Sequence, residues 1–196
     1  MFHPLSNLGK YDVILASGSP RRRELLTMLD IKFTVDSSHS VDETVPAGTP
    51  AETIPEQLSR LKAAAYPIEP SSGKLVITAD TIVLIDGEVL GKPADMKDAC
   101  VMLARLQGRT QRVITGVTIR TASQSQTWSA ESEVEFANLT APEIAYYVEK
   151  YRPLDKAGAY GIQEWIGAAA IRSIHGSFYN VMGLPVHRLY SALKEF

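Results

Sequence analysis

The sequence predicts an α/β protein with a mixed sheet, because short apolar runs typical of strands alternate along the chain with segments of helical periodicity. Its 196 residues, 45% hydrophobic and 21% charged, are typical of a globular protein. A chain of this length buries roughly 70% of its unfolded surface, so it needs no metal or disulfide to fold. No repeat or low-complexity tract interrupts the pattern. We therefore expect one domain over residues 1–196.

The expected strands are apolar or alternate at period two. The longest is an apolar run interrupted only by Thr78, Asp80 and Thr81, and the turn Asp86-Gly87 follows it and starts a hairpin. Two later stretches alternate at period two across an SQSQ turn and predict a second hairpin. The expected strands are residues 12–17, 32–35, 75–85, 112–121 and 128–136.

The expected helices follow from apolar spacing and from capping residues. Thr53 and Thr140 each precede a glutamate by three residues, which predicts two capping boxes. Asp95 caps a helix that stops at Gly108, and the chain closes on a helix in LPVHRLYSALKEF. Apolar faces are predicted from Leu25, Leu26 and Leu29, from Leu58, Leu61 and Ala65, from Ala99, Met102, Leu103 and Leu106, and from Ile144, Tyr147, Val148 and Tyr151.

Charge and cysteine content exclude several classes of function. With 20 basic and 22 acidic residues and a net charge of -2, the chain lacks the basic excess of a dedicated nucleic-acid binder. The single cysteine, Cys100, favours a reducing compartment, and the N-terminus has no signal-peptide core or membrane span, so we expect a cytoplasmic protein. The histidines lack zinc spacing, and the GxSxG, GxxxxGK and GxGxxG motifs are absent.

The ASGSPRRR stretch after the first expected strand is the first candidate site. Ser19 can cap the following helix, and Pro20 suits its first turn. Arg21, Arg22 and Arg23 in that turn oppose the helix dipole by roughly 0.3–1 kcal/mol each, unless an anion such as a triphosphate binds there. The pattern indicates a phosphate site or, alternatively, a solvated basic turn.

Asp80 is the second candidate, because it interrupts an apolar run. A buried carboxylate without a partner costs several kcal/mol, so something must compensate it. Asp80 is therefore a general base for water, a metal ligand or, alternatively, a cap on backbone amides at a strand break. Lys62, Lys92 and Glu43, each taken alone, predict only surface positions.

Eight motifs then occur in a recognised order: ASGSPRR, DE, SRLKA, ITADTIV, GKPAD, VITGV, DKAGAYGIQ and SFYNVMGLP. In this order the sequence resembles the Maf (septum formation inhibitor-like) family of nucleotide pyrophosphatases. The resemblance spans about Ile14 to Phe196, and DKAGAYGIQ is its most specific block. The AGAYGIQ version is similar to the branch that acts on dTTP and UTP, rather than the branch that prefers 7-methyl-GTP.

The resemblance also implies roles for single residues. Asp80 matches the catalytic aspartate of the family, which accepts a proton from the attacking water. Glu43 matches a metal-site carboxylate, although an extra residue in HSVDE leaves Asp42 as an alternative. The positions linked to substrate choice are Arg21, Thr81 and Gln163, and those that line the cleft are Ser17, Arg22, Lys62 and Lys92.

The family further implies two α/β lobes around a deep cleft, similar to the inosine triphosphate pyrophosphatase fold, and a homodimer. The implied reaction is attack of water at the α-phosphorus with a divalent cation, Mg²⁺ or Mn²⁺, and it yields a nucleoside monophosphate and pyrophosphate. A regulator of cell division that senses nucleotide without turnover is the alternative. Neither hypothesis involves a nucleic-acid or membrane partner.

Overall fold

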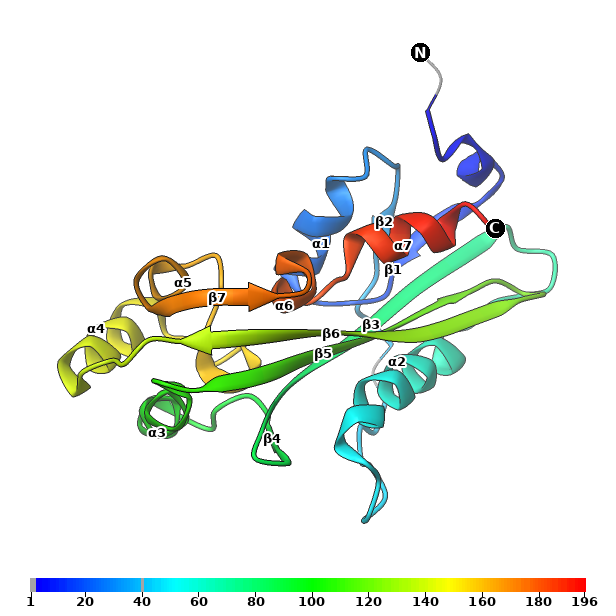
Figure 1. Cartoon of the computed structure of the whole chain (residues 1–196). Coiled ribbons are helices and arrows are strands. Elements are labelled where there is room, and N and C mark those ends of the chain that lie inside the picture. The colour runs from blue at the N-terminus through cyan, green and yellow to red at the C-terminus, as the bar shows by residue number, and fades with distance from the viewer. Residues whose placement is uncertain (1–2, 40) are drawn as a thin grey trace. The chain divides into compact units, whose positions relative to one another are not determined.

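A seven-stranded mixed sheet organises the chain in this computed structural model, which describes residues 3–39 and 41–196 and thus leaves out Met1, Phe2 and Ser40. The strand order is β2-β1-β3-β5-β6-β7, with β4 paired to β3 (Figure 1). β1 is parallel to both β2 and β3, whereas β3–β4 and β6–β7 are antiparallel. The prediction of an α/β fold with a mixed sheet is confirmed.

The chain divides into two compact units, and β3, β5 and β6 each contribute one half to each unit. Unit 1 comprises Met1–Asp80, Thr115–Ala130 and Gly183–Phe196, and unit 2 comprises Thr81–Ile114 and Glu131–Met182. A single functional domain over 1–196, and the cleft implied by the family resemblance, stay predictions.

Unit 1 contains the parallel part of the sheet. Figure 1 shows α2 on one side of its strands and α1 and α7 on the other. Its elements are η1 (Ser6–Lys10), β1 (Asp12–Leu15), α1 (Pro20–Thr27), β2 (Thr34–Val35), η2 (Ala51–Thr53), α2 (Ile54–Ala65) and α7 (Val186–Leu193), with parts of β3 (Lys74–Ile85), β5 (Thr110–Arg120) and β6 (Ser125–Phe136).

Unit 2 contains the other parts of those three strands and four of the α-helices of the described chain. Within it, α3 packs against α4 and η3, and α5 contacts β7. Its own elements are β4 (Glu88–Leu90), α3 (Met96–Leu106), α4 (Ala141–Tyr151), η3 (Ala157–Ala159), α5 (Trp165–Ala170), β7 (Ile171–His175) and α6 (Phe178–Met182).

The predicted helix caps form at three of four positions. Ser19 accepts from the Arg22 amide, Asp95 caps α3, and Thr140 forms the complete capping box with Glu143. The capping box predicted at Thr53 is wrong. Thr53 ends η2 in a helical conformation. Its hydroxyl donates to the Pro50 carbonyl and accepts from the Gln57 side-chain amide, and it does not accept from a backbone amide of α2.

The buried face of α2 also differs from the predicted stripe. Leu58 is buried as expected, but Leu61 is 42% exposed, and Ser59 is fully buried instead. Ser59 is accommodated because its hydroxyl bonds to Thr118 and its carbonyl accepts from the Thr78 hydroxyl. Two polar strand residues therefore contact the buried side of α2.

Strand β5 does not follow the expected alternation, because every residue from Val113 to Ile119 is buried. Its strand neighbours β3 and β6 cover only its edges, so both faces of this stretch must be covered by other elements; α2 is one of them, since its Ser59 hydroxyl bonds to Thr118. β6 keeps the predicted alternation, with Trp128, Ser132, Val134 and Phe136 buried.

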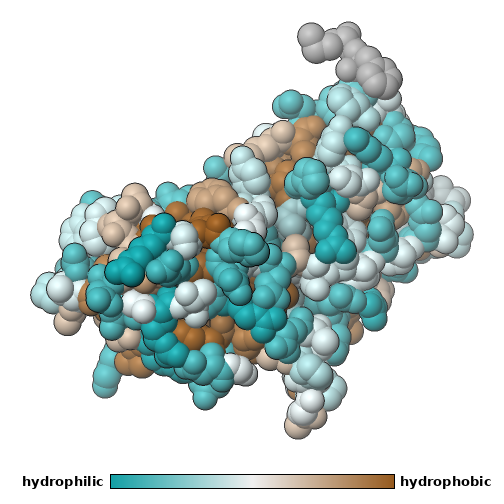
Figure 2. All heavy atoms as spheres, in the orientation of Figure 1, coloured by the Kyte–Doolittle hydropathy of each residue, from teal (hydrophilic) through white to brown (hydrophobic). Residues whose placement is uncertain are grey.

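The surface is mixed in character. Figure 2 shows hydrophilic residues over most of the face in view, with hydrophobic areas between them. Across the described part of the chain, the structure contains no helix of the length and hydrophobicity needed to cross a bilayer.

Gly116 is required where β5 approaches α2. A Cβ at this position would lie 2.2 Å from the backbone carbon and oxygen of Pro55. Gly116→Ala should therefore lower the free energy of unfolding by about 1–3 kcal/mol, because helix and strand must move apart. Chemical denaturation measures this loss. Gly9→Ala is the control, since a Cβ there meets no atom within 4 Å, and equal stability of the two variants would contradict the close approach.

Candidate functional site

The turn between β1 and α1 forms the first part of the site. Small residues follow Leu15, and the Ser17 hydroxyl oxygen accepts from the Ser19 amide at 3.3 Å. Ser19 in turn caps α1. The first-turn amides and the partial positive charge of the helix end favour an anion here.

Arg22 folds back from α1 instead of extending into solvent. Its Nε donates to the Gly183 carbonyl at 2.8 Å, and a terminal nitrogen contacts Ser17 Oγ at 3.4 Å. Burial lowers the pKa of Arg22; the Asp80 and Glu43 carboxylates oppose this effect, and Arg21 adds to it. Both carboxylates thus act electrostatically on Arg22, whereas Arg23, the third arginine, is exposed.

Lys62 connects the two carboxylates. Its Nζ lies 2.7 Å from Asp80 Oδ1 and 3.1 Å from Glu43 Oε1, and the Lys62 side chain is only 20% exposed. It lies in the last turn of α2, whose final carbonyls accept hydrogen bonds from Arg120. An arginine at a helix C-terminus satisfies free carbonyls and complements the helix dipole. Arg120 thus stabilises the turn that carries Lys62.

Asp80 has the compensating partner that its sequence context required. It follows five buried residues on β3, and its side chain is 14% exposed. The ion pair with Lys62 offsets the loss of hydration. A carboxylate has acceptor capacity on both oxygens, so a donor on Oδ1 still leaves Asp80 able to accept a proton.

The loop after β2 places Glu43, rather than Asp42, beside Lys62. Asp42 Oδ1 instead accepts from the backbone amide of Thr44 at 2.9 Å and from its hydroxyl. Upstream in the loop, Asp36 accepts from the Tyr66 hydroxyl at 2.7 Å, which ties this loop to the end of α2. Hydrogen bonds from Ser38 and Tyr66 lower the pKa of Asp36 to about 2.

The donor set suits a magnesium-type cation only in part. No group of three or more His, Cys, Asp or Glu side chains able to hold a metal occurs among residues 3–39 and 41–196. Mg²⁺, however, is commonly held by one or two carboxylates together with water and substrate phosphates. Asp80 and Glu43, which share Lys62, form such a pair.

The other three predicted residues belong to unit 2. Thr81 follows Asp80 on β3, Lys92 is exposed after β4, and Gln163 is exposed in the loop before α5. The Gly158 amide donates to the Gly91 carbonyl at 3.0 Å, next to Lys92. Gly158 also packs closely against Val83 of β3.

Unit 1 thus brings together six of the predicted residues, and unit 2 contains the remaining three. The Gly183 carbonyl, Arg120 and Tyr66 support the unit 1 cluster but were not predicted as site residues. Gly183 falls in the SFYNVMGLP motif, which was a usable signal, whereas Arg120 and Tyr66 carry none.

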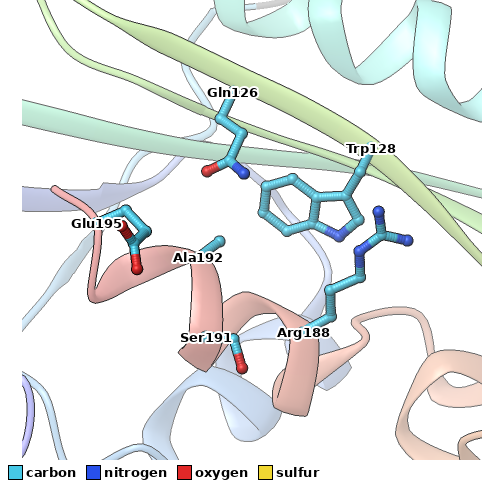
Figure 3. Close-up of a pocket in the computed structure, with 6 residues that line it drawn as sticks. All are labelled: Gln126, Trp128, Arg188, Ser191, Ala192 and Glu195. Atoms are coloured by element: carbon cyan, nitrogen blue, oxygen red, sulfur yellow. The ribbon is translucent and has the colours of Figure 1, made fainter.

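A separate hollow of about 260 Å³ lies in unit 1 between β6 and α7 (Figure 3). Arg188 lies over the ring of Trp128, at 5.7 Å from its centroid. None of the predicted site residues is among the side chains that line this hollow: Gln126, Trp128, Arg188, Ser191, Ala192 and Glu195.

Comparison with known proteins identifies chains that are similar to this one. A dTTP/UTP pyrophosphatase of Porphyromonas gingivalis is 53% identical over 194 residues, which cover 98% of each chain. One of Bacteroides thetaiotaomicron is 51% identical over 191 residues, covering 97% of this chain and 99% of the relative. A solved HAM1 protein from Coxiella burnetii covers 95% of this chain and 100% of its own, with a TM-score of 0.49 and 16% identity.

The family model described as Maf-like protein matches residues 12–196. This match and the relatives with about half of their residues identical confirm the resemblance found in the motifs. The chain therefore belongs to the Maf-like protein family.

Proposed function

We propose that this protein is a hydrolase that converts dTTP and UTP, and modified pyrimidine triphosphates, to the monophosphate and pyrophosphate. The observation that carries the proposal is Lys62, whose ammonium lies between the Asp80 and Glu43 carboxylates close to the Arg22 turn. Relatives that are 42–53% identical to this chain bear the name dTTP/UTP pyrophosphatase, which supports the choice of substrate.

The phosphates are bound by the cationic residues of the site. Arg21 and Arg22 lie at the N-terminus of α1, where the helix end and the Ser17 hydroxyl add donors. Lys62 and Lys92 supply further positive charge. Catalysis of phosphoryl transfer rests mainly on such positioning and charge neutralisation.

Asp80 accepts a proton from the attacking water. The water oxygen forms a bond to the α-phosphorus as the bond from that phosphorus to the bridging oxygen breaks. Pyrophosphate leaves with the bonding electrons, and the proton of the water passes to the Asp80 carboxylate. Lys62 holds this carboxylate in place through the contact at Oδ1.

Glu43, together with Asp80, is the proposed holder of a divalent cation, Mg²⁺ or Mn²⁺. Such an ion neutralises phosphate charge and assists departure of the pyrophosphate. Glu43 suits this role because it is 54% exposed on a loop and is therefore open to a cation that arrives with the nucleotide.

Arg21, Thr81 and Gln163 choose the substrate in this proposal. A glutamine amide has two donors and one acceptor, which suits the polar edge of a pyrimidine ring. Gln163 is exposed, so its amide is available for such a contact.

The proposal places the enzyme in the cytoplasm as a homodimer, without a nucleic-acid or membrane partner. The single cysteine, half-buried on α3, supports a reducing compartment. Homodimerisation rests on the family resemblance alone.

Product analysis tests the proposal directly. The purified chain is incubated with each common triphosphate and with Mg²⁺ or Mn²⁺, and pyrophosphate and orthophosphate are measured separately. We expect pyrophosphate, with dTTP and UTP as the best substrates. Orthophosphate as the sole product would move the cleavage to the outer phosphates, and nucleotide binding without any product would favour a sensing role.

Removal of the proposed base should separate catalysis from binding. Asp80→Asn keeps the size of the side chain but cannot accept the proton, so kcat should fall by roughly 10²-fold to 10⁴-fold. Nucleotide affinity, measured by calorimetry, should remain near that of the wild type. Asp86→Asn is the matched control, because Asp86 is an exposed carboxylate that pairs with Arg109 at the β3–β4 turn. Unchanged kcat in Asp80→Asn would reject the assigned role.

The first-turn arginines should differ sharply in importance. Arg22→Lys keeps the charge but loses the planar fork that bonds Gly183 and Ser17, so KM for UTP should rise by about 10-fold or more. Arg23→Lys should leave KM unchanged, because Arg23 is exposed. Steady-state kinetics on both variants provides the measurement, and equal losses in the two would argue against a specific phosphate contact at Arg22.

A further inference from the structure

The proposed base-reading residue, Gln163, lies in a four-residue turn. The turn begins at Gly161 and ends at Glu164, whose amide donates to the Gly161 carbonyl at 3.0 Å. Gln163 is the third residue of the turn and is exposed, whereas Gly161 and Ile162 are buried. The position of the Gln163 side chain therefore depends on how firmly the two ends of the turn are held.

One hydroxyl group holds both ends. Tyr147, on α4, is completely buried. Its hydroxyl donates to Glu164 Oε2 and accepts from the Gly161 amide at 2.9 Å. These two bonds use both functions of the hydroxyl and connect the first and last residues of the turn to a rigid helix.

Glu164 is held from a second side as well. Lys156 Nζ lies 3.1 Å from Glu164 Oε1, and the Lys156 side chain is only 9% exposed. Gly161 leaves the space that the carboxylate needs, because a Cβ there would lie 2.8 Å from Glu164 Cδ. Both carboxylate oxygens of Glu164 are thus bound, and a side chain at Gly161 would displace them.

Tyr147 itself is firmly placed. Its ring stacks on Tyr151 with centroids 5.0 Å apart, and it also faces Trp165 at 6.5 Å. Burial raises the pKa of the Tyr147 hydroxyl, and the bond to Glu164 raises it further, so the hydroxyl keeps its proton at any ordinary pH. The donor to Glu164 is therefore always present.

Rigidity at this turn matters for base selection. Uracil presents an N–H donor and a carbonyl acceptor where cytosine presents a ring-nitrogen acceptor and an amino donor. A glutamine amide can match either edge by turning over, because it contains both a donor and an acceptor. Discrimination therefore requires that the backbone place the amide so that only one of these matches is made.

We propose that Tyr147 is a positioning residue for pyrimidine selection, because it clamps the Gly161–Glu164 turn that presents Gln163 to the base. This proposal rests on the proposed function of Gln163. In this proposal, selectivity between pyrimidine bases depends on the Tyr147 hydroxyl and its two hydrogen bonds as well as on the Gln163 amide that contacts the base.

Tyr147→Phe tests the clamp, because it removes one oxygen atom and leaves the ring. We expect the ratio of kcat/KM for UTP to that for CTP to fall by about 10-fold, since the turn loses its bonds at both ends. Most of the loss should appear in KM for UTP. Tyr151→Phe is the matched control. Tyr151 lies on the same helix and its ring stacks on Tyr147, so the variant loses a hydroxyl at a neighbouring position and should leave the ratio unchanged.

The Gln163→Ala variant distinguishes the proposed role of Tyr147 from the proposed role of Gln163 in base reading. If Gln163→Ala leaves the UTP to CTP ratio unchanged, base reading by Gln163 is wrong and the clamp has no role. If Gln163→Ala lowers the ratio but Tyr147→Phe does not, the clamp alone is overturned. With both roles correct, the double variant loses no more selectivity than Gln163→Ala alone.

Glu164→Gln keeps the test valid if Tyr147→Phe fails to fold. It retains one acceptor oxygen but places an amide beside the Lys156 ammonium, and it should lower the same ratio. A well-folded Glu164→Gln variant with wild-type selectivity would overturn the clamp, and thermal melting of each variant identifies those that are folded.

Discussion

The ion pair between Lys62 and Asp80 is the interaction on which the candidate site depends. Asp80 interrupts a strand whose preceding residues are buried, and without a cation the carboxylate would lose its hydration uncompensated. The pair forms only if α2 lies at one distance and in one register against the sheet. Hydrogen bonds between Ser59 and the strand residues Thr78 and Thr118 hold that register, and Gly116 permits the distance. Packing beneath α2 therefore controls the geometry of the carboxylate.

Local sequence rules predicted much of the fold. Two nearly identical motifs show where such rules fail. Thr53-Ile-Pro-Glu56 and Thr140-Ala-Pro-Glu143 both match the capping-box pattern, yet only Thr140 forms the box. Thr53 belongs to a preceding turn of 3-10 helix, and the Pro50 carbonyl takes its hydroxyl. The four residues of the motif do not contain that competing partner. The burial of β5 on both faces likewise depends on the elements that pack over the sheet, such as α2, and the sequence of the strand does not specify them.

The sequence predicted that the Asp80 carboxylate needs a partner, but it did not predict which side chains contact one another in the site. A carboxylate in an apolar run demanded a partner, but physical reasoning alone did not select Lys62, which lies 18 residues away, over other lysines. The family motifs identified Lys62 as one of two lysines that line the cleft, together with Lys92, but did not pair it with Asp80. Arg22 bonds a carbonyl 161 residues distant, and Tyr147 reaches Glu164 from another helix. Such contacts arise from the tertiary fold, because each partner taken alone has an ordinary local pattern.

Each unit contains a lysine paired with a glutamate at the same distance, but the two pairs are suited to different tasks. Lys62–Glu43 and Lys156–Glu164 both measure 3.1 Å. Buried ion pairs add little stability beyond the cost of desolvation, so their value lies in geometry. Glu164 is also bound by Tyr147, and Lys156, which pairs with Asp155 as well, is almost inaccessible, so this pair is shielded from solvent ions. Glu43 is largely exposed, so an arriving anion can draw Lys62 away from it and an arriving cation can take its place. The Lys62–Glu43 pair can therefore exchange partners when a ligand binds. The Lys156–Glu164 pair instead stays in place and keeps the recognition turn in one shape.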